Sequence, residues 1–322
     1  MPKVFVTRRI PEPAETLLNE RHYAVTINPY DRVLTARELG ESVVGADAIL
    51  SLLTDRVDGT LMDAAGAQLK VIANYAVGYD NIDLAAAKTR GIAVTNTPGV
   101  LTEAVAEHAF ALLMACARRI PESDAFTRAG SYTGWAPMLL MGSEVHEKVL
   151  GIVGLGRIGS ALAKKAVQGF DMKVLYHDVK PNAEFETSFG AGYRELPALL
   201  READFVSIHV PLVEATRHLI GEQQLHMMKK TAYLINTSRG PVIDEAALVR
   251  ALRERWIAGA GLDVFEYEPK LSEGLATLAN AVLTPHTASA TLETRSAMAR
   301  IAAENIIAVL EGKGPLNPVT VS

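Results

Sequence analysis

The sequence predicts an α/β protein with two parallel-sheet domains and a cleft between them. Short β-branched runs alternate with stretches of helical spacing along nearly the whole chain, a pattern typical of parallel α/β folds. The alternation falls into two series, one before residue 100 and one after residue 148. A chain of 322 residues with 49% apolar composition also exceeds the usual size of one compact core.

The predicted strands are short, whereas two longer segments have helical spacing. Residues 102–119 are apolar on one face, with Glu early and Arg late, as the helix dipole favours. A helix over residues 292–311 is expected to return to the first domain. The expected strands are Val4–Thr7, Ala48–Leu52, Val71–Asn74 and Ala93–Asn96, then one from Val149, followed by Lys173–His177, Phe205–Val210, Ala232–Asn236, Gly259–Val264 and Val282–Thr284.

Charge and composition exclude several classes of function. The net charge of −5, from 32 basic and 37 acidic residues, is spread without long blocks of one sign, so we expect no nucleic-acid or membrane partner. No apolar run reaches the roughly twenty residues that span a bilayer, and the amino-terminal segment lacks the apolar core of a signal peptide. The single cysteine, Cys116, is expected to be a buried hydrophobe. We expect no metal site and a cytoplasmic location.

A glycine-rich turn follows the strand that begins at Val149. Gly154, Gly156 and Gly159 have G-x-G-x-x-G spacing between this strand and a helical run. The first glycine permits a tight turn, the second lets backbone amides approach a pyrophosphate, and the third lets the helix pack closely against the strand. In this context the spacing predicts a dinucleotide-binding site.

The next predicted strand ends at Asp178, about twenty residues beyond the last glycine. A carboxylate at this place accepts a hydrogen bond from a ribose 2′-hydroxyl and repels a 2′-phosphate. We therefore expect NAD(H) to be favoured. NADP(H) stays an alternative because the neighbouring Lys180 partly offsets the repulsion.

Three further polar residues follow predicted strands of the second series, where an open α/β sheet binds its ligands. Arg239 has the planar guanidinium that can hold a 2-oxo acid by its carboxylate and carbonyl oxygens together. His286 is the residue type best able to donate a proton near neutral pH. Glu268 can pair with the imidazole and fix which nitrogen faces the substrate. Together they predict a proton donor beside a hydride donor.

Several long motifs occur in one order and cover nearly the whole chain. They are Asn74–Asp83, Thr95–Thr102, Gly151–Gly159, Ile235–Gly240 and Ala258–Glu266. In these motifs the sequence resembles the D-2-hydroxyacid dehydrogenase family, and within it most closely the glyoxylate and hydroxypyruvate reductases. The resemblance implies Rossmann-like and flavodoxin-like domains and NAD(P)-dependent reduction of a small 2-oxo acid, glyoxylate to glycolate or hydroxypyruvate to D-glycerate.

The resemblance also implies a role for each site residue. Arg239 binds substrate, Glu268 orients and charges the histidine, and His286 is the acid/base. The substrate-binding residues are Leu53, lining a small pocket, the backbone amides of Val77 and Gly78 at the carboxylate, Arg239 and His286. The cofactor-binding residues are Gly154, Gly156, Arg157, Ile158 and Gly159 at the pyrophosphate, Asp178 at the ribose, Thr237, Ser238, Arg239, Asp263 at the nicotinamide amide, His286 and Ala288.

In that family the substrate domain uses both ends of the chain. We place the crossings near Leu101 and Thr287, which gives a substrate-binding domain of residues 1–101 and 287–322 and a dinucleotide-binding Rossmann domain of residues 102–286. Thr287 and Ala288 stand where these reductases usually carry an apolar residue and glycine. Their added bulk is expected to narrow the space on the nicotinamide side of the site.

Similar family members are dimers joined through their dinucleotide domains, so a homodimer is expected, with helix 102–119 at the interface. The arm Tyr132–Gly142, containing Trp135, either reaches the partner's active site or packs within its own subunit.

Two other functions share this architecture. A phosphite dehydrogenase has a similar arm but places a lysine near its dianionic substrate, where this chain has Ala76. NAD-sensing transcriptional corepressors are similar in fold and retain the Arg, Glu and His. The compact chain, without the extended disordered tail that such regulators often carry, favours the reductase.

Overall fold

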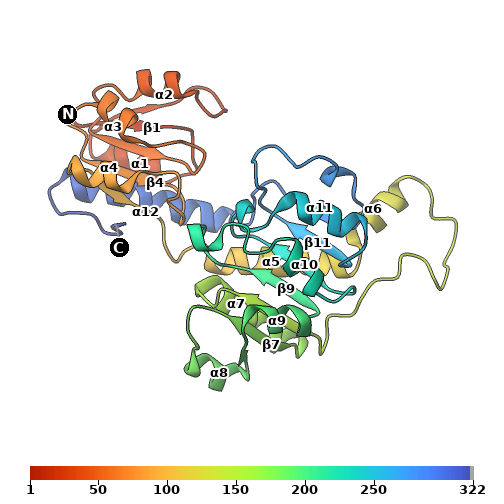
Figure 1. The fold of residues 1–322 in the computed structure, drawn as a ribbon. Helices are drawn as coiled ribbons and strands as arrows, with labels where there is room; N and C mark the ends of the chain where they lie inside the picture. The colour runs from red at the N-terminus through yellow and green to blue at the C-terminus, as the bar shows by residue number, and fades with distance from the viewer. Residues whose placement is uncertain (320–322) are drawn as a thin grey trace. The chain divides into compact units, whose positions relative to one another are not determined.

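The computed structural model describes residues 1–319 and divides into two compact units (Figure 1). The first unit comprises Met1–Leu101 with the segment from Ala290 onward, and the second comprises Thr102–Ser289. The chain therefore passes from one unit to the other after Leu101 and again after Ser289, whereas the sequence indicates crossings near Leu101 and Thr287.

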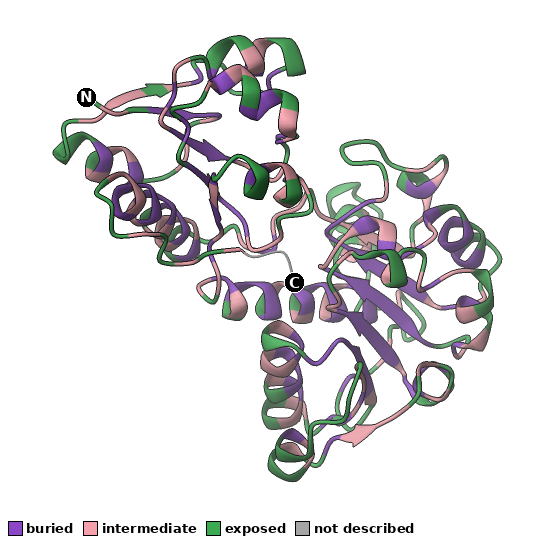
Figure 2. Cartoon of the chain, turned by 60° about the vertical axis from the view of Figure 1, so that its left-hand side comes forward, coloured by how far each residue is buried: buried purple, intermediate pink, exposed green. Residues whose placement is uncertain are grey.

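The first unit has a five-stranded parallel sheet in the order β2-β1-β3-β4-β5, which is the flavodoxin-like order. Its central strands β3 and β4 are buried at every position because helices cover both faces (Figure 2). The strands are β1 Lys3–Val6, β2 Ala24–Ile27, β3 Ala48–Ser51, β4 Val71–Asn74 and β5 Ala93–Thr95. The helices are α1 Ala14–Glu20, α2 Ala36–Ser42, α3 Gly59–Ala65, α4 Leu84–Thr89 and α12 Leu292–Leu310.

The second unit has a seven-stranded parallel sheet in the order β12-β11-β10-β9-β6-β7-β8, the Rossmann order with one further strand. The strands are β6 Val149–Val153, β7 Lys173–His177, β8 Gly192–Tyr193, β9 Phe205–Ile208, β10 Tyr233–Asn236, β11 Gly259–Leu262 and β12 Ala281–Leu283. The α-helices are α5 Thr102–Ala117, α6 Ile120–Arg128, α7 Arg157–Phe170, α8 Ala183–Phe189, α9 Leu196–Glu202, α10 Glu222–Met227 and α11 Glu245–Arg253. The 3₁₀ turns are η1 Glu214–Thr216, η2 Gly240–Val242 and η3 Leu275–Thr277.

The predicted fold class is confirmed, and the differences lie at edges and ends. The hydrophobic pattern of the sequence did not indicate β2 and β8, because they are edge strands whose residues are not fully buried. The helix expected over 102–119 ends at Ala117, because Arg119 takes a left-handed φ of 52° before α6 begins. The expected strands β1, β3, β5 and β12 end one residue early, and β9 and β11 end two residues early.

The core of the second unit contains Cys116 on the buried face of α5. Burial raises the pKa of its thiol to about 12, so it is a packing residue. A Cβ added at Gly261 of β11 would lie 3.1 Å from both the Cys116 sulfur and Leu112 Cβ, so this glycine lets helix and sheet approach closely.

Residues 1–319 contain neither a candidate membrane span nor a candidate metal-binding cluster. Within this range, no helix has the length and apolarity needed to cross a bilayer. In the same range, no three His, Cys, Asp or Glu side chains are grouped to hold a metal ion.

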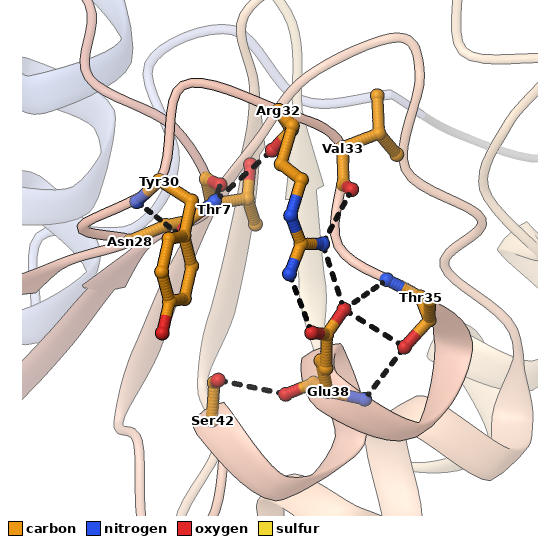
Figure 3. Close-up of polar contacts among 8 residues, drawn as sticks. All are labelled: Thr7, Asn28, Tyr30, Arg32, Val33, Thr35, Glu38 and Ser42. Atoms are coloured by element: carbon orange, nitrogen blue, oxygen red, sulfur yellow. Dashed lines mark hydrogen bonds and ion pairs between the residues drawn. The ribbon is translucent and has the colours of Figure 1, made fainter.

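In the first unit, helix α2 begins in a closed polar network (Figure 3). The Thr35 hydroxyl accepts from the Glu38 N–H, and the Glu38 carboxylate accepts from the Thr35 N–H, which forms a capping box. Arg32 donates to both oxygens of Glu38, at 2.6 and 2.9 Å. Hydrogen bonds from Arg32 and then from Thr35 hold the pKa of Glu38 well below its usual range.

Replacing Thr35 by Val removes the hydroxyl acceptor while keeping the shape of the side chain. We expect the free energy of unfolding of the first unit to fall by about 1 kcal/mol, the usual contribution of a helix N-cap. Thr35→Ser keeps the hydroxyl and should stay close to wild type. Urea unfolding followed by circular dichroism measures the free energy of unfolding of both variants. Equal values for Thr35→Val and Thr35→Ser would show that the cap does not stabilise this unit.

Candidate active site

The candidate site of the second unit lies where its parallel strands end. All strands of a parallel sheet point the same way, so their carboxyl ends share one edge. The strand order reverses at β6, which lies between β7 and β9, and such a switch point is where open α/β sheets bind ligands. The segments that leave this edge carry Gly154 after β6, Asp178 after β7, Thr237 to Arg239 after β10, Asp263 after β11 and His286 after β12.

The structure places Glu268 and His286 in direct contact. Glu268 Oε2 lies 2.9 Å from His286 Nδ1, and Glu268 Oε1 accepts from the N–H of Phe265 at 2.9 Å. About a quarter of the His286 side chain is exposed, 26%, so a ligand can reach the ring. Because Nδ1 faces the carboxylate, Nε2 is the nitrogen left to face a substrate. A carboxylate-paired imidazole of this kind can exchange a proton with a bound oxygen.

The backbone around His286 is fixed by the buried Asp263. The His286 N–H donates to the carbonyl oxygens of Asp263 and Thr284, and its φ is 55°, a left-handed conformation that is uncommon outside glycine. The Asp263 carboxylate accepts from the Thr284 hydroxyl at 2.6 Å and from the N–H groups of Thr287 and Ala288 at 2.8 Å. One carboxylate therefore holds the chain on both sides of His286.

His108 on α5 completes this network. Its Nε2 lies 3.0 Å from Thr284 Oγ1 and 3.4 Å from Asp263 Oδ1. Burial raises the pKa of Asp263, but the hydrogen bonds from His108, Thr284, Thr287 and Ala288 outweigh it and leave the pKa below its ordinary value. Asp263 is therefore an anion at neutral pH, and a charged acceptor makes stronger hydrogen bonds than a neutral one.

Arg239 follows β10 in a turn that Asn236 organises. The Asn236 side chain donates to the Arg239 carbonyl and accepts from the Ser238 N–H, both at 3.0 Å. A Cβ added at Gly240 would lie 1.9 Å from the Phe265 carbonyl, so the chain after Arg239 runs directly against the segment that leads to Glu268. This close approach brings the arginine and the Glu268–His286 pair to one part of the sheet edge.

The glycine turn has the form that a dinucleotide needs. Gly154 has a φ of 98°, and an added Cβ would meet Val210 N at 2.8 Å. A Cβ on Gly159 would lie 2.3 Å from the Gly154 carbonyl oxygen, whereas a Cβ on Gly156 would meet no atom within 4 Å. Gly156 is the N-cap of the 14-residue helix α7 and gives no side-chain cap, so the helix's first N–H groups are not capped by it and can bind an anion.

Other residues at the same edge fit the rest of a dinucleotide. Asp178 accepts from the Leu155 N–H at 2.7 Å, which ties it to the glycine turn. Among residues 1–319, the buried Thr237 hydroxyl has no hydrogen-bond partner, as expected of a group that a ligand would satisfy. Burial lowers the pKa of His209 to about 4, so it is neutral near pH 7 and cannot serve as the acid.

The other expected substrate residues, Leu53, Val77 and Gly78, belong to the first unit. The Val77 carbonyl accepts from Asn96 at 2.8 Å and the Gly78 carbonyl accepts from Asn74 at 2.9 Å. Within the described part of the chain, no hydrogen bond uses the N–H of Val77 or of Gly78. The asparagines thus hold the carbonyls and leave two amides that can bind a carboxylate.

Sequence reasoning did not indicate His108 or Asn236. The sequence offered only a weak indication that either residue supports the site. His108 is a polar residue within the apolar stretch of α5. Asn236 is a fully buried amide at the last position of a strand. A buried polar side chain needs partners, but only the fold shows that theirs are the loops carrying His286 and Arg239.

Comparison with known proteins shows the family of the chain. Residues 110–288 match the model of the D-isomer specific 2-hydroxyacid dehydrogenase NAD-binding domain. A glyoxylate reductase of Korarchaeum cryptofilum is 52% identical over 320 residues, which cover 99% of this chain and 96% of that protein.

Two solved structures are similar over 99% of the chain. The TT0316 protein of Thermus thermophilus is 45% identical, with all of that chain covered and a TM-score of 0.92. The NADPH-dependent glyoxylate/hydroxypyruvate reductase of Sinorhizobium meliloti in complex with citrate is 34% identical, with 98% of that chain covered and a TM-score of 0.85. The protein therefore belongs to the D-isomer-specific 2-hydroxyacid dehydrogenase family and is an NAD(P)-dependent enzyme of that family.

Proposed function

We propose that this enzyme reduces glyoxylate to glycolate and hydroxypyruvate to D-glycerate, with His286 as the acid/base. The contact of His286 Nδ1 with Glu268 at 2.9 Å, at the carboxyl edge of the Rossmann sheet, carries the proposal. Relatives named as glyoxylate reductases, about half identical over nearly the full chain, support the choice of substrate.

When bound, the reduced nicotinamide supplies a hydride to the carbonyl carbon. Arg239 holds the carboxylate and carbonyl oxygens of the 2-oxo acid through its planar guanidinium, which fixes the carbon for attack. Protonated His286 gives its proton from Nε2 to the carbonyl oxygen as that oxygen becomes a hydroxyl. Glu268 stays ionised and stabilises the imidazolium before the transfer. One hydride and one proton are added, and the oxidised cofactor and neutral imidazole remain.

The first unit has the substrate-binding role in this proposal, with the amides of Val77 and Gly78 as carboxylate ligands and Leu53 as a pocket residue. The second unit, matched over residues 110–288 by an NAD-binding domain model, has the cofactor-binding role. In it we assign Gly154, Gly156, Arg157, Ile158, Gly159, Asp178, Thr237, Ser238, Arg239, Asp263, His286 and Ala288 to the dinucleotide. A buried, unpaired cysteine is consistent with a reducing cytoplasmic location.

We further propose that NAD(H) is preferred to NADP(H). The Asp178 carboxylate accepts from the N–H groups of Leu155 and Val179, both at 2.7 Å, so it is held at the end of β7 as an acceptor for a ribose hydroxyl. A 2′-phosphate at this place would meet a negative charge. The exposed Lys180 is the nearby group that would favour the phosphate.

A homodimer is also proposed. The arm Tyr132–Gly142 is an extended loop in Figure 1, and Trp135, Met138 and Met141 are 83%, 72% and 56% exposed. Trp135 is therefore not packed within its own subunit. Large apolar side chains gathered on one exposed segment mark an interaction surface, and a second copy is the partner we propose for it.

Steady-state oxidation of NADH and NADPH with glyoxylate, hydroxypyruvate and pyruvate tests the activity. We expect NADH-linked turnover of glyoxylate and hydroxypyruvate, and a loss of at least about 100-fold in kcat for His286→Ala, since general acid catalysis contributes that much or more. His226→Ala, a change at an exposed histidine on α10, should leave the rate unchanged. Tight NADH binding without turnover of any acid would favour an NAD-sensing regulator, and turnover of phosphite would favour a phosphite dehydrogenase.

Two glycine substitutions separate folding from cofactor binding. Gly156→Ala meets no protein atom within 4 Å, so thermal stability should stay near wild type while NADH affinity falls, because the new Cβ occupies the pyrophosphate side of the turn. Gly159→Ala collides with the Gly154 carbonyl and should lower the melting temperature itself. Calorimetric unfolding and NADH fluorescence titration give the two readouts. Unchanged NADH affinity in Gly156→Ala would place the pyrophosphate elsewhere.

The dimer is tested by sedimentation equilibrium at micromolar concentrations. Wild type should have twice the chain mass, and Trp135→Ser combined with Met138→Ser should shift the equilibrium towards monomer because apolar area at the interface is lost. Val179→Ser changes a side chain that is 96% exposed elsewhere in the unit and is the matched control. A wild-type monomer at these concentrations would refute the homodimer.

A further inference from the structure

The first residue of α11, Glu245, is a buried carboxylate that the proposed mechanism does not use. It is 3% exposed, and charged side chains are rarely buried this far without partners. Its partners are neither lysine nor arginine. Glu245 Oε2 accepts from the N–H of Glu266, and Glu245 Oε1 accepts from the N–H of Ser272, both at 2.7 Å.

These two N–H groups stand at the ends of one loop. We call residues 266–272 the Glu268 loop, since it carries the carboxylate that pairs with His286. One side chain, by accepting at Glu266 and at Ser272, closes the loop at its base. Within the loop, the Lys270 N–H donates to the Tyr267 carbonyl at 2.9 Å and forms a turn around Glu268.

The attachment is reciprocal. Glu266 Oε2 accepts from the N–H of Glu245 at 3.2 Å, and Glu266 Oε1 lies 2.6 Å from His218 Nε2. The helix that carries Glu245 is itself firmly placed, because Ala247, Leu248 and other residues of α11 are buried in the core. The loop is therefore fastened to a rigid element and not only to its own turn.

The position of the Glu268 carboxylate follows from this fastening. Its Oε1 accepts from the Phe265 N–H, directly before the loop, and its Oε2 reaches His286 at 2.9 Å. Both contacts depend on where the backbone of residues 265–268 lies. Displacement of a catalytic group by about 1 Å can lower a rate by up to about 100-fold.

We propose that Glu245 is a positioning residue for the reaction: by holding both ends of the Glu268 loop, it sets the geometry of the Glu268–His286 pair. The inference rests on the proposed role of that pair. It predicts that Glu245 acts on the chemical step and far less on the binding of cofactor or substrate, because neither end of the loop is among the residues assigned to those ligands.

Glu245→Gln is the informative variant. Glutamine has the same length but one carbonyl acceptor, and its NH₂ group cannot accept, so it can hold one end of the loop and not both. We expect kcat with glyoxylate to fall by about 10-fold in Glu245→Gln and by about 100-fold in Glu245→Ala. The KM for glyoxylate and the Kd for NADH should stay within about 2-fold of wild type. Deuterated NADH should give a larger isotope effect on kcat in both variants, because hydride transfer becomes slower relative to product release.

Asp204→Asn is the matched control. Asp204 also accepts two hydrogen bonds in the second unit, from the Val149 N–H at 3.0 Å and from Lys229 Nζ at 2.8 Å, but at the amino ends of the strands. It should lose thermal stability without losing kcat. If Asp204→Asn and Glu245→Gln lower kcat equally, or if Glu245→Gln keeps the wild-type kcat, Glu245 has a general structural role and the proposal is wrong.

Two further measurements separate this inference from the proposed function. His286→Ala in the same assay tests the acid/base role, so an active His286→Ala enzyme would overturn that role and the inference together. Amide hydrogen exchange measures opening of the loop without any turnover. At least one of the N–H groups of Glu266 and Ser272 should exchange faster in Glu245→Gln, both should in Glu245→Ala, and both should keep the wild-type rate in Asp204→Asn. If the Glu266 and Ser272 N–H groups were protected from exchange in Glu245→Gln as in wild type, Glu245 would not hold the loop, even if kcat fell as expected.

Discussion

The parallel alignment of the seven strands in the second unit is the constraint on which its candidate site depends. Polar groups that are distant in the sequence meet at one edge because every strand of the sheet ends there. The reversal of strand order at β6 then opens room beside the glycine turn, between the segments that follow β6 and β9. Glycines at Gly154, Gly159 and Gly240 allow backbone approaches at this edge that no side chain would permit.

Carboxylates hold the loops that leave this edge. Asp178 accepts from the glycine turn, Asp263 accepts from the chain on both sides of His286, and Glu245 accepts from both ends of the loop with Glu268. A carboxylate accepts several N–H groups at once, and hydrogen bonds to a charged acceptor are roughly twice as strong as neutral ones. Carboxylates that accept backbone N–H groups thus hold the glycine turn, the segment with His286 and the loop with Glu268.

In the first unit, amide side chains and one buried carboxylate hold the loops that follow β3 and β4. Asn74 and Asn96 bind the carbonyls of Gly78 and Val77, and Asn81 donates to the carbonyls of Leu52 and Asp55. The Asp55 carboxylate, which is 5% exposed, accepts from the Leu52 N–H at 2.8 Å and from the Thr7 hydroxyl. Burial raises the pKa of Asp55, because desolvation disfavours the charged form.

The sequence by itself determined the two α/β series and the glycine turn with Asp178, because hydrophobic period and local motifs are encoded within short segments. It also indicated Arg239, Glu268 and His286, the chemical groups of the proposed reaction. Edge strands β2 and β8 gave little signal, since few of their residues are buried. Only the tertiary structure decided which polar residues hold the site. His108 and Glu245 act through contacts with residues 176 and 27 positions away, and no local pattern encodes such a partner. Their roles arise only when helix packing brings a buried side chain against a distant loop.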